Sequence, residues 1–242
     1  MRENTIFVAG AGGAIGRPLC RLLVDEGYRV VGTTRKRDRL ADLENLGVIP
    51  VIVDVFDAEK LRRAVIDSGA EIVVHQLTDL PAGLDPAHMP AALLRNARLR
   101  DIGTKNLVAA AAEANVRLMV AQSIAFAYAP GPQPHAESDP LNVSGSEATV
   151  SARAVANMEQ QVLNAAFEGI VLRYGKLYGP GTGFDNAPMG GPVHVDAAAD
   201  AARRAVVQGG SGVFNVAEED GAVSVTKFKS AFGWDPEFRL SK

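Results

Sequence analysis

Three glycines follow the first apolar segment of the chain at a spacing that suits phosphate binding. Residues 5–9 (TIFVA) lead into Gly10, and Gly13 and Gly16 follow before a segment with leucines on one helical face. Gly10 can make the tight turn after a strand, Gly13 lets a phosphate approach the backbone, and Gly16 lets helix and strand pack closely. The pattern predicts a diphosphate at the start of the first helix, and a glycine-rich turn without a ligand is the alternative. The predicted diphosphate contacts are Gly10, Gly13, Ala14, Ile15 and Gly16.

Basic residues follow the second predicted strand, where the adenosine ribose of a dinucleotide lies in such sites. Thr34 leads directly into Arg35, with Arg39 just beyond. The first acid after this strand is Asp38. An acid at the strand end holds the ribose 2′-hydroxyl of NAD, whereas guanidinium groups hold the 2′-phosphate of NADP. We therefore expect NADP to be preferred, with NAD as the alternative cofactor and a solvated basic surface as the competing interpretation.

The ends of two further predicted strands are expected at the same edge of the sheet as the glycine turn. Asp54 and Val55 follow residues 49–53, where a carboxylate and a backbone amide can reach the adenine edge; Asp54 could equally cap the next helix. His75 ends the fourth predicted strand, and we expect it to be a buried packing residue. The residues after it are predicted to contact the cofactor ribose through their backbone: Gln76, Leu77 and Thr78.

Apolar runs of strand length alternate with helical segments, a pattern typical of a parallel sheet covered on both faces. We expect an α/β, Rossmann-type, doubly wound fold spanning residues 1–242 as one domain, with a seven-stranded, mainly parallel sheet. A small, reduced C-terminal substrate lobe is expected at about 179–195 and 217–242. The predicted strands are 5–9, 29–33, 49–53, 72–75, 117–122, 169–173 and 212–216. The predicted helices are 15–26, 60–67, 93–114, 151–167 and about 225–232.

Composition narrows the classes of partner. The net charge of −3 gives no basic surface for nucleic acid, and the sequence has no apolar stretch long enough to span a membrane. A single cysteine and the absence of a signal-peptide pattern indicate a cytoplasmic protein with a small-molecule substrate. His135 and His194 lack metal-ligand spacing, so no metal is expected. The alanine-rich helix 93–114 either covers the sheet or, with helix 151–167, forms a homodimer interface.

Four segments together resemble the extended and atypical short-chain dehydrogenase/reductases of the NAD-dependent epimerase/dehydratase type. Residues 9–16 (AGAGGAIG) are similar to the family's glycine turn, and residues 103–107 (GTKNL) to its GTxNL segment. Residues 172–181 (LRYGKLYGPG) and 193–196 (VHVD) are similar to its LRxxxxYGPG and xHVxD motifs. The resemblance covers most of the chain and implies a nicotinamide dinucleotide cofactor.

The family's Tyr-x-x-x-Lys pair is missing from this chain. In that pair the lysine lowers the pKa of the tyrosine so that it can exchange a proton with the substrate. None of the four tyrosines has a lysine four residues later. Counting back from Glu159, which resembles the end of the family's catalytic helix motif, the tyrosine place falls on Ser151 and the lysine place on Val155. The usual proton relay is therefore absent from this helix.

Two other residues are candidates for chemistry in its place. Ser123 lies one position from the family's catalytic serine or threonine, and could bind substrate or cofactor or satisfy local backbone instead. Tyr128 is the best remaining phenol for acid/base work, with Tyr174 and Lys176 as further candidates.

The resemblance implies an NAD(P)-binding oxidoreductase or epimerase/dehydratase-like protein acting on a small carbonyl or nucleotide-sugar-like substrate. The missing pair motivates an alternative, a non-catalytic NADP-binding sensor or scaffold. Loss of a positioned acid/base slows catalysis by roughly a hundredfold to ten-thousandfold, which does not forbid it.

Overall fold

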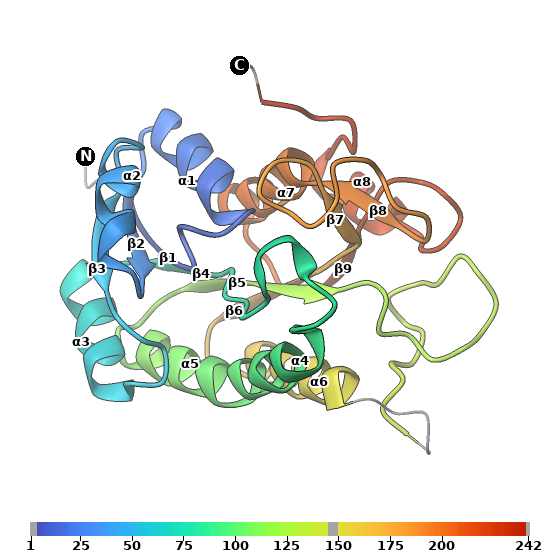
Figure 1. Cartoon of the computed structure of the whole chain (residues 1–242). Helices are drawn as coiled ribbons and strands as arrows, with labels where there is room; N and C mark the ends of the chain where they lie inside the picture. Colours follow the sequence, from blue (N-terminus) through green and yellow to red (C-terminus); the bar gives the residue numbers. More distant parts are fainter. Residues whose placement is uncertain (1–3, 145–149, 241–242) are drawn as a thin grey trace.

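A seven-stranded parallel sheet forms the centre of the computed structural model, which describes residues 4–144 and 150–240 (Figure 1). The strands follow the order β3-β2-β1-β4-β5-β6-β9. Strands β2 and β3 are therefore added on one side of β1, and the later strands on the other side, beginning with β4. The expected doubly wound fold is confirmed, and its ligand crevice belongs outside the carboxyl ends of the strands at this change of side. The strands are β1 (Thr5–Ala9), β2 (Arg29–Thr34), β3 (Ile49–Ile52), β4 (Ile72–His75), β5 (Leu118–Ile124), β6 (Glu168–Tyr174) and β9 (Gly212–Val216).

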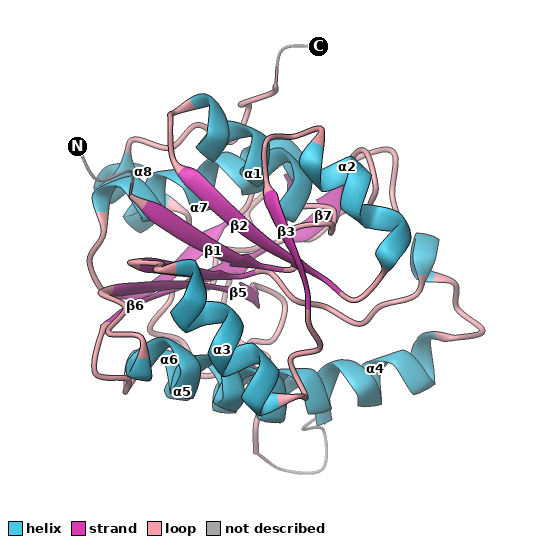
Figure 2. Cartoon of the chain, turned by 90° about the vertical axis from the view of Figure 1, so that its left-hand side faces the viewer, coloured by secondary structure: helices cyan, strands magenta, loops and turns pink. Residues whose placement is uncertain are grey.

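Helices cover both faces of the sheet (Figure 2). Alternation along β1 explains the two cores, because Ile6 and Val8 point to one face and Phe7 to the other. One face is covered by α1 (Gly16–Asp25), α2 (Leu40–Glu44), α7 (Val195–Gln208) and α8 (Thr226–Phe232). The other is covered by α3 (Ala58–Ser68), α4 (Met89–Arg98), α5 (Thr104–Glu113) and α6 (Val150–Leu163). In the described part of the chain, no helix is both long enough and apolar enough to cross a membrane.

The helix predicted over 93–114 starts earlier in the structure and is interrupted. It begins four residues earlier, at Met89, and α4 and α5 are separated by a π-helical turn at Leu99–Gly103. A π turn inserts an extra residue into the helix and rotates the side chains that follow. Leu94 and Ile102 are exposed on this segment, and a homodimer through it stays a prediction.

Helix α7 is absent from the predicted elements. Its apolar residues are mainly alanines, whose short side chains give a weak periodic pattern but let α7 pack closely against α1. His194 caps it, since its Nδ1 accepts the backbone N–H of Asp196 at 3.1 Å. Asp200, fully buried, forms ion pairs with Arg203 and Arg204 one turn further along.

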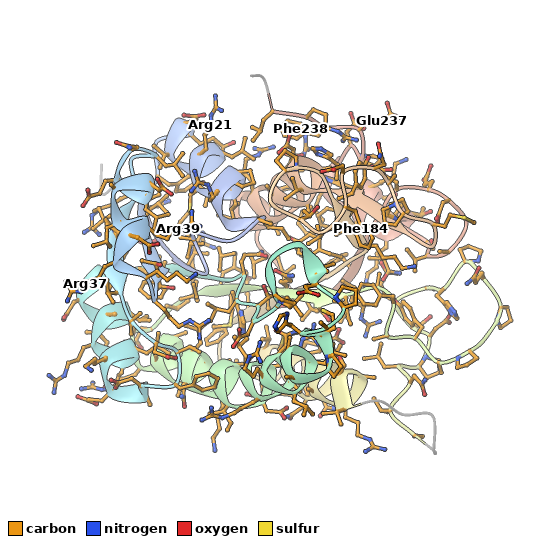
Figure 3. The ribbon with its side chains drawn as sticks, viewed as in Figure 1. Arg21, Arg37, Arg39, Phe184, Glu237 and Phe238 are labelled. Atoms are coloured by element: carbon orange, nitrogen blue, oxygen red, sulfur yellow. The ribbon has the colours of Figure 1, made fainter. Side chains whose placement is uncertain are left out.

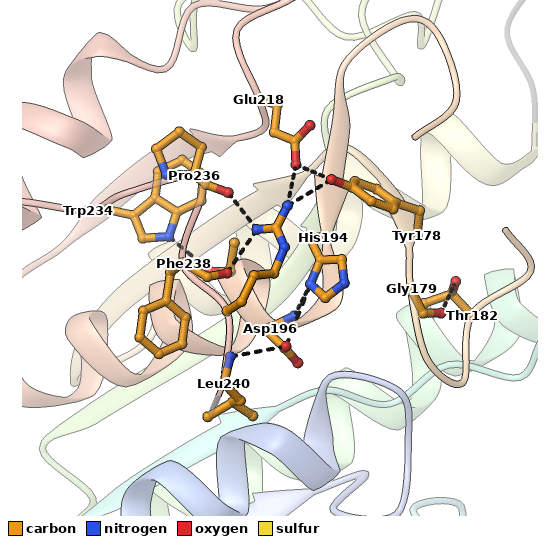
Figure 4. A network of polar contacts seen from close by, with 12 residues as sticks. Tyr178, Gly179, Thr182, His194, Asp196, Glu218, Trp234, Pro236, Phe238 and Leu240 are labelled. Atoms are coloured by element: carbon orange, nitrogen blue, oxygen red, sulfur yellow. Dashed lines mark hydrogen bonds and ion pairs between the residues drawn. The ribbon is translucent and has the colours of Figure 1, made fainter. Parts of the chain in front are cut away.

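A second, two-stranded parallel sheet was also not expected. It pairs β7 (Lys176–Tyr178) with β8 (Pro192–His194) beside the C-terminal tail. Arg239 of the tail donates to the Tyr178 hydroxyl at 2.9 Å, and the Leu240 N–H donates to Asp196 at 3.2 Å (Figure 4). These contacts tie the end of the described chain to the region expected to be the substrate lobe, a role that stays a prediction.

Candidate functional site

A crevice of about 240 Å³ opens at the carboxyl edge of the sheet, beyond the ends of the neighbouring strands β1 and β4. The turn after β1, the end of β2 and the segment after β4 form most of its wall. The predicted site residues that line it are Gly10, Gly13, Thr34, Arg35, Arg39, Val55, Gln76, Leu77 and Thr78. It is also lined by residues that were not predicted: Ala9, Gly12, Thr33, Lys36, Val53, Leu61 and Leu99.

The glycine turn has the geometry of a phosphate cradle. Gly10 has φ +91°, and a Cβ there would lie 2.7 Å from the Gln76 carbonyl oxygen. A Cβ at Gly16 would collide with the carbonyl oxygen of Gly10, whereas Gly12 faces open space. Both tight contacts require glycine, because any side chain would push β1, β4 and α1 apart.

The start of α1 is left available to an anion. Its N-cap, Ile15, provides no side-chain acceptor, and the first turn holds no acidic residue. Among the described residues, the Gly13 N–H donates to the Gly10 carbonyl and the Arg17 N–H to the Gly13 carbonyl, but no side chain caps this end of the helix, which is the situation that favours a bound phosphate. Ala14, Ile15 and Gly16 form this end of the helix and border the crevice without being part of its lining. The residues present fit a diphosphate.

The end of β2 presents cations to the crevice and no carboxylate. Thr33 Oγ1 accepts the Gly10 N–H at 3.2 Å, which joins β2 to the glycine turn. The Arg35 guanidinium lies 3.8 Å from Asp79, and that of Arg39 lies 3.2 Å from Asp42. Both arginine side chains remain about half exposed, at 51% and 49%, so they are free to reach a ligand. Arg37, in contrast, lies toward the outer edge of the molecule and does not line the crevice (Figure 3).

Asp54 and Val55 have different positions after β3. Val55 lines the crevice, whereas Asp54 does not and accepts the Phe56 N–H at 2.9 Å. The suggestion that Asp54 caps α3 is wrong, because Asp57 does so by accepting the Lys60 N–H at 3.1 Å. A contact of Asp54 with adenine stays a prediction.

His75 is a buried packing residue, as expected. Its Nε2 lies 2.9 Å from Thr104 Oγ1, and its Nδ1 accepts the Leu77 N–H at 3.3 Å. Burial, reinforced by the nearby Arg100 guanidinium, lowers the pKa of His75 to about 4. The imidazole is therefore neutral at physiological pH and helps to shape the turn that Leu77 adds to the crevice.

Gln76 lines the crevice, and its side chain lies near the buried Tyr174 hydroxyl. Within the described residues, the Gln76 amide and the Tyr174 hydroxyl are buried and lack a partner at hydrogen-bond geometry. Burial raises the pKa of Tyr174, and the Gln76 side chain is near enough to offset part of this rise. A neutral phenol and an unpaired amide here can complete their hydrogen bonds with a ligand or a bound water.

Ser123 and Tyr128 lie together in a buried network centred on Arg173. Ser123 Oγ, with no exposed surface, donates to Glu159 at 2.6 Å, and Arg173 holds both oxygens of Glu159 at 2.9 and 2.7 Å. The Tyr128 hydroxyl accepts from Arg173 at 2.9 Å and donates to Asn215 at 2.7 Å. Burial raises the pKa of Tyr128, so the phenol stays protonated at neutral pH. Neither residue lines the crevice, and a catalytic role for either stays a prediction.

The positions expected for the missing pair hold no proton relay. Val155 is fully buried, and the Ser151 hydroxyl accepts a hydrogen bond from Arg100 at 3.0 Å. Arg100 comes from the π turn between α4 and α5. Nothing in the spacing of the sequence pointed to this residue, because the rotation of the π turn brings it inward.

A loop from the predicted substrate lobe approaches the glycine turn from the other side. A Cβ on Gly181 would lie 3.8 Å from Ala14, and one on Gly183 would lie 2.5 Å from Leu84. The loop therefore reaches from the start of α1 to the segment after β4. Phe184 follows it and is 44% exposed, so an aromatic side chain is available at this border (Figure 3).

Comparisons with known proteins agree with this geometry. The family model described as "NAD dependent epimerase/dehydratase family" matches residues 6–212. A 3-diazoavenalumate denitrifying reductase from a Streptomyces species is 40% identical, over 90% of this chain and 77% of its own length. Cinnamoyl-CoA reductase 1 from Petunia hybrida is 36% identical over 48% of this chain and 34% of its own length.

Solved structures show the same fold at low sequence identity. The Bordetella bronchiseptica enzyme WbmG in complex with NAD has a TM-score of 0.77 at 18% identity, covering 98% of this chain and 90% of its own. A UDP-glucose-4-epimerase from Stenotrophomonas maltophila, with bound NAD and formylated UDP-arabinopyranose, has a TM-score of 0.79 at 16% identity, covering 98% and 94%.

The glycine turn yields a binding prediction. Gly13→Asp places a carboxylate where the diphosphate is expected, and such like-charge contacts cost several kcal/mol, so dinucleotide affinity should fall by more than about 100-fold. Isothermal titration calorimetry with NADP and NAD measures this loss. Gly12→Ala, whose Cβ meets open space, is the matched variant that keeps the fold. Undiminished binding by Gly13→Asp would place the dinucleotide elsewhere.

The network around Arg173 yields a stability prediction. Ser123→Ala removes a hydrogen bond to an ionised carboxylate, so the free energy of unfolding should fall by about 1.5–3 kcal/mol. Urea denaturation followed by circular dichroism measures the change. Ser211→Ala, which removes a hydroxyl that accepts the Gly169 N–H near the protein surface, is the control with a smaller loss. A Ser123→Ala variant of unchanged stability would leave the hydroxyl free for chemistry.

Proposed function

Because the chain belongs to the NAD dependent epimerase/dehydratase family, we propose that it is an NADP-dependent reductase acting on a small aromatic substrate. The observation that carries this proposal is a dinucleotide crevice with a cationic end and no tyrosine–lysine relay beside it. The similarity to a reductase over 77% of that relative's length supports hydride transfer to a substrate rather than sugar epimerisation.

The residues that would hold the cofactor divide into two groups. The amides at Ala14 and Ile15 would hold the diphosphate beside Gly13, whose own N–H donates to the Gly10 carbonyl, while Arg35 and Arg39 would hold the 2′-phosphate. Guanidinium groups bind phosphate through charge-assisted hydrogen bonds, and no carboxylate lines the end of β2 to take the 2′-hydroxyl of NAD instead. Bound there in reduced form, the nicotinamide supplies a hydride.

The substrate class follows from the missing proton donor. Ser151 and Val155 occupy the places of the usual pair, and the Ser123 and Tyr128 hydroxyls are engaged in the buried network. Reduction of a ketone forms an alkoxide that must be protonated, and within the described residues the unpaired phenol of Tyr174 is fully buried with a raised pKa, which makes it a poor acid for that step. A substrate whose reduction needs no proton suits the site better.

An aryl diazo group meets this requirement. Hydride adds at the carbon that bears nitrogen, a C–H bond forms, and the C–N bond breaks with its electron pair leaving in N₂. The arene is reduced, the nicotinamide is oxidised, and no proton is consumed. The Streptomyces relative is named for a diazo substrate and for denitrifying reduction, which supports the same class of substrate for this chain.

The activity test compares three substrate classes with NADPH: a 4-carboxybenzenediazonium salt, cinnamaldehyde and UDP-glucose. We expect NADPH oxidation and N₂ release with the diazonium salt, and deuterium from [4-²H]NADPH in the product. Gly13→Asp serves as the control for uncatalysed reduction. Interconversion of UDP-glucose without net NADPH oxidation would make the chain an epimerase. Tight NADPH binding with no turnover of any substrate would favour the sensor.

Cofactor preference is tested separately. Arg35→Ala should weaken NADP binding by about 10-fold while changing NAD binding little, since only NADP carries the 2′-phosphate. Arg37→Ala is the matched control, because this neighbouring arginine does not line the crevice. Calorimetric titration of each variant with both cofactors measures the ratio. Equal losses for NADP and NAD would remove Arg35 from the 2′-phosphate site.

A further inference from the structure

Arg100 is a buried cation without a counter-ion among the residues that the structure describes. Its side chain and backbone together are only 8% exposed, and Nη1 donates to the neutral Ser151 hydroxyl at 3.0 Å. In residues 4–144 and 150–240 this is the one hydrogen bond that the Arg100 side chain makes, and it forms no ion pair there. The remaining guanidinium N–H groups are therefore available. An unpaired buried charge lowers the stability of the folded chain unless a ligand neutralises it.

The surrounding groups do not supply the missing negative charge. Glu159 is the carboxylate whose field reaches Arg100, but its oxygens already bind Arg173 and Ser123. His75, on the opposite side, is neutral because burial lowers its pKa. Arg173 thus takes the Glu159 carboxylate, and the Glu137 carboxylate of the same cluster accepts the Asn215 N–H at 2.8 Å, so neither forms an ion pair with Arg100.

Local backbone geometry directs Arg100 inward. It lies in the π turn Leu99–Gly103, where Leu99 lines the crevice and Ile102 is exposed, and Arg98, the last residue of α4, is exposed too. π turns interrupt the regular hydrogen-bond pattern of an α-helix and occur frequently at functional sites. Here the turn places a cation one residue from the crevice wall and against the first turn of α6, which carries Ser151.

We infer that Arg100 binds a carboxylate of the substrate, so the natural substrate is an aromatic acid. A planar guanidinium matches a carboxylate in geometry and forms paired charge-assisted hydrogen bonds with it. The aromatic part of this inference rests on the proposed function; the anionic part rests on the unpaired charge. Arg100 then occupies, with Ser151, the place that the tyrosine–lysine pair takes in related enzymes, and selects the substrate instead of moving a proton.

Binding of cinnamate and cinnamamide to the NADP-loaded protein tests the inference without turnover. These probes share size and shape and differ in charge. The wild-type chain should bind cinnamate more tightly than cinnamamide, and Arg100→Met should lose about 10- to 100-fold in cinnamate affinity, as expected for hydrogen bonds to a charged group. Cinnamamide and NADP affinities should stay unchanged. Arg98→Met, which removes an exposed arginine of the same segment, is the control.

Thermal unfolding separates this role from a structural one. Without its unpaired charge, ligand-free Arg100→Met should unfold at the same temperature as the wild type or higher, and Arg100→Lys should retain part of the cinnamate affinity. Equal binding of the two probes by the wild type, unchanged cinnamate binding by Arg100→Met, or a large loss of both stability and NADP binding in that variant would overturn the inference. Arg100-dependent binding of cinnamate without reduction of the diazonium salt would instead reject only the proposed function.

Discussion

The close approach of bare backbone at the end of β1 sets the geometry of the molecule. Gly10 lies against the carbonyl of Gln76, and Gly16 lies against the carbonyl of Gly10, so neither position has room for a Cβ. These contacts hold the start of α1 over the ends of the paired strands β1 and β4. A helix end without a side-chain cap then borders the crevice, and the cationic end of β2 is joined to it through Thr33.

A second constraint is the buried pair of Arg173 and Glu159. Removing either partner would leave an uncompensated charge inside the protein, which costs more than the pair contributes over a neutral alternative. The pair therefore requires its neighbours, and Ser123, Tyr128 and Asn215 supply the remaining hydrogen bonds. The Ser123 and Tyr128 hydroxyls are therefore engaged in hydrogen bonds within the core.

The absence of the tyrosine–lysine pair changes which charged group lies beside α6. With Val155 in the lysine position, no ammonium remains on α6 to activate a phenol. A guanidinium from the π turn reaches Ser151 instead. Its high pKa, about 10 even after burial, keeps it charged at neutral pH, so it suits anion binding better than proton transfer.

The sequence by itself determined the seven strands of the central sheet, the glycine turn and the basic end of β2. These features depend on local patterns, namely alternation of apolar residues, glycine spacing and the types of residue at a strand end. It also determined that no tyrosine–lysine pair exists, because a spacing can be counted. Helix α7 escaped detection because its apolar face consists mainly of alanine, which contrasts weakly with the other residues.

Only the tertiary structure decided which polar groups are occupied and which are free. Asp57 rather than Asp54 caps α3, Glu159 holds Ser123, and Arg100 has no carboxylate partner in the part of the chain that is described. Each of these facts depends on side chains from elements far apart in sequence, or on the rotation imposed by a π turn. Residue type and spacing cannot specify them, since the burial and hydrogen bonding of a polar group are set by the neighbours that folding brings to it.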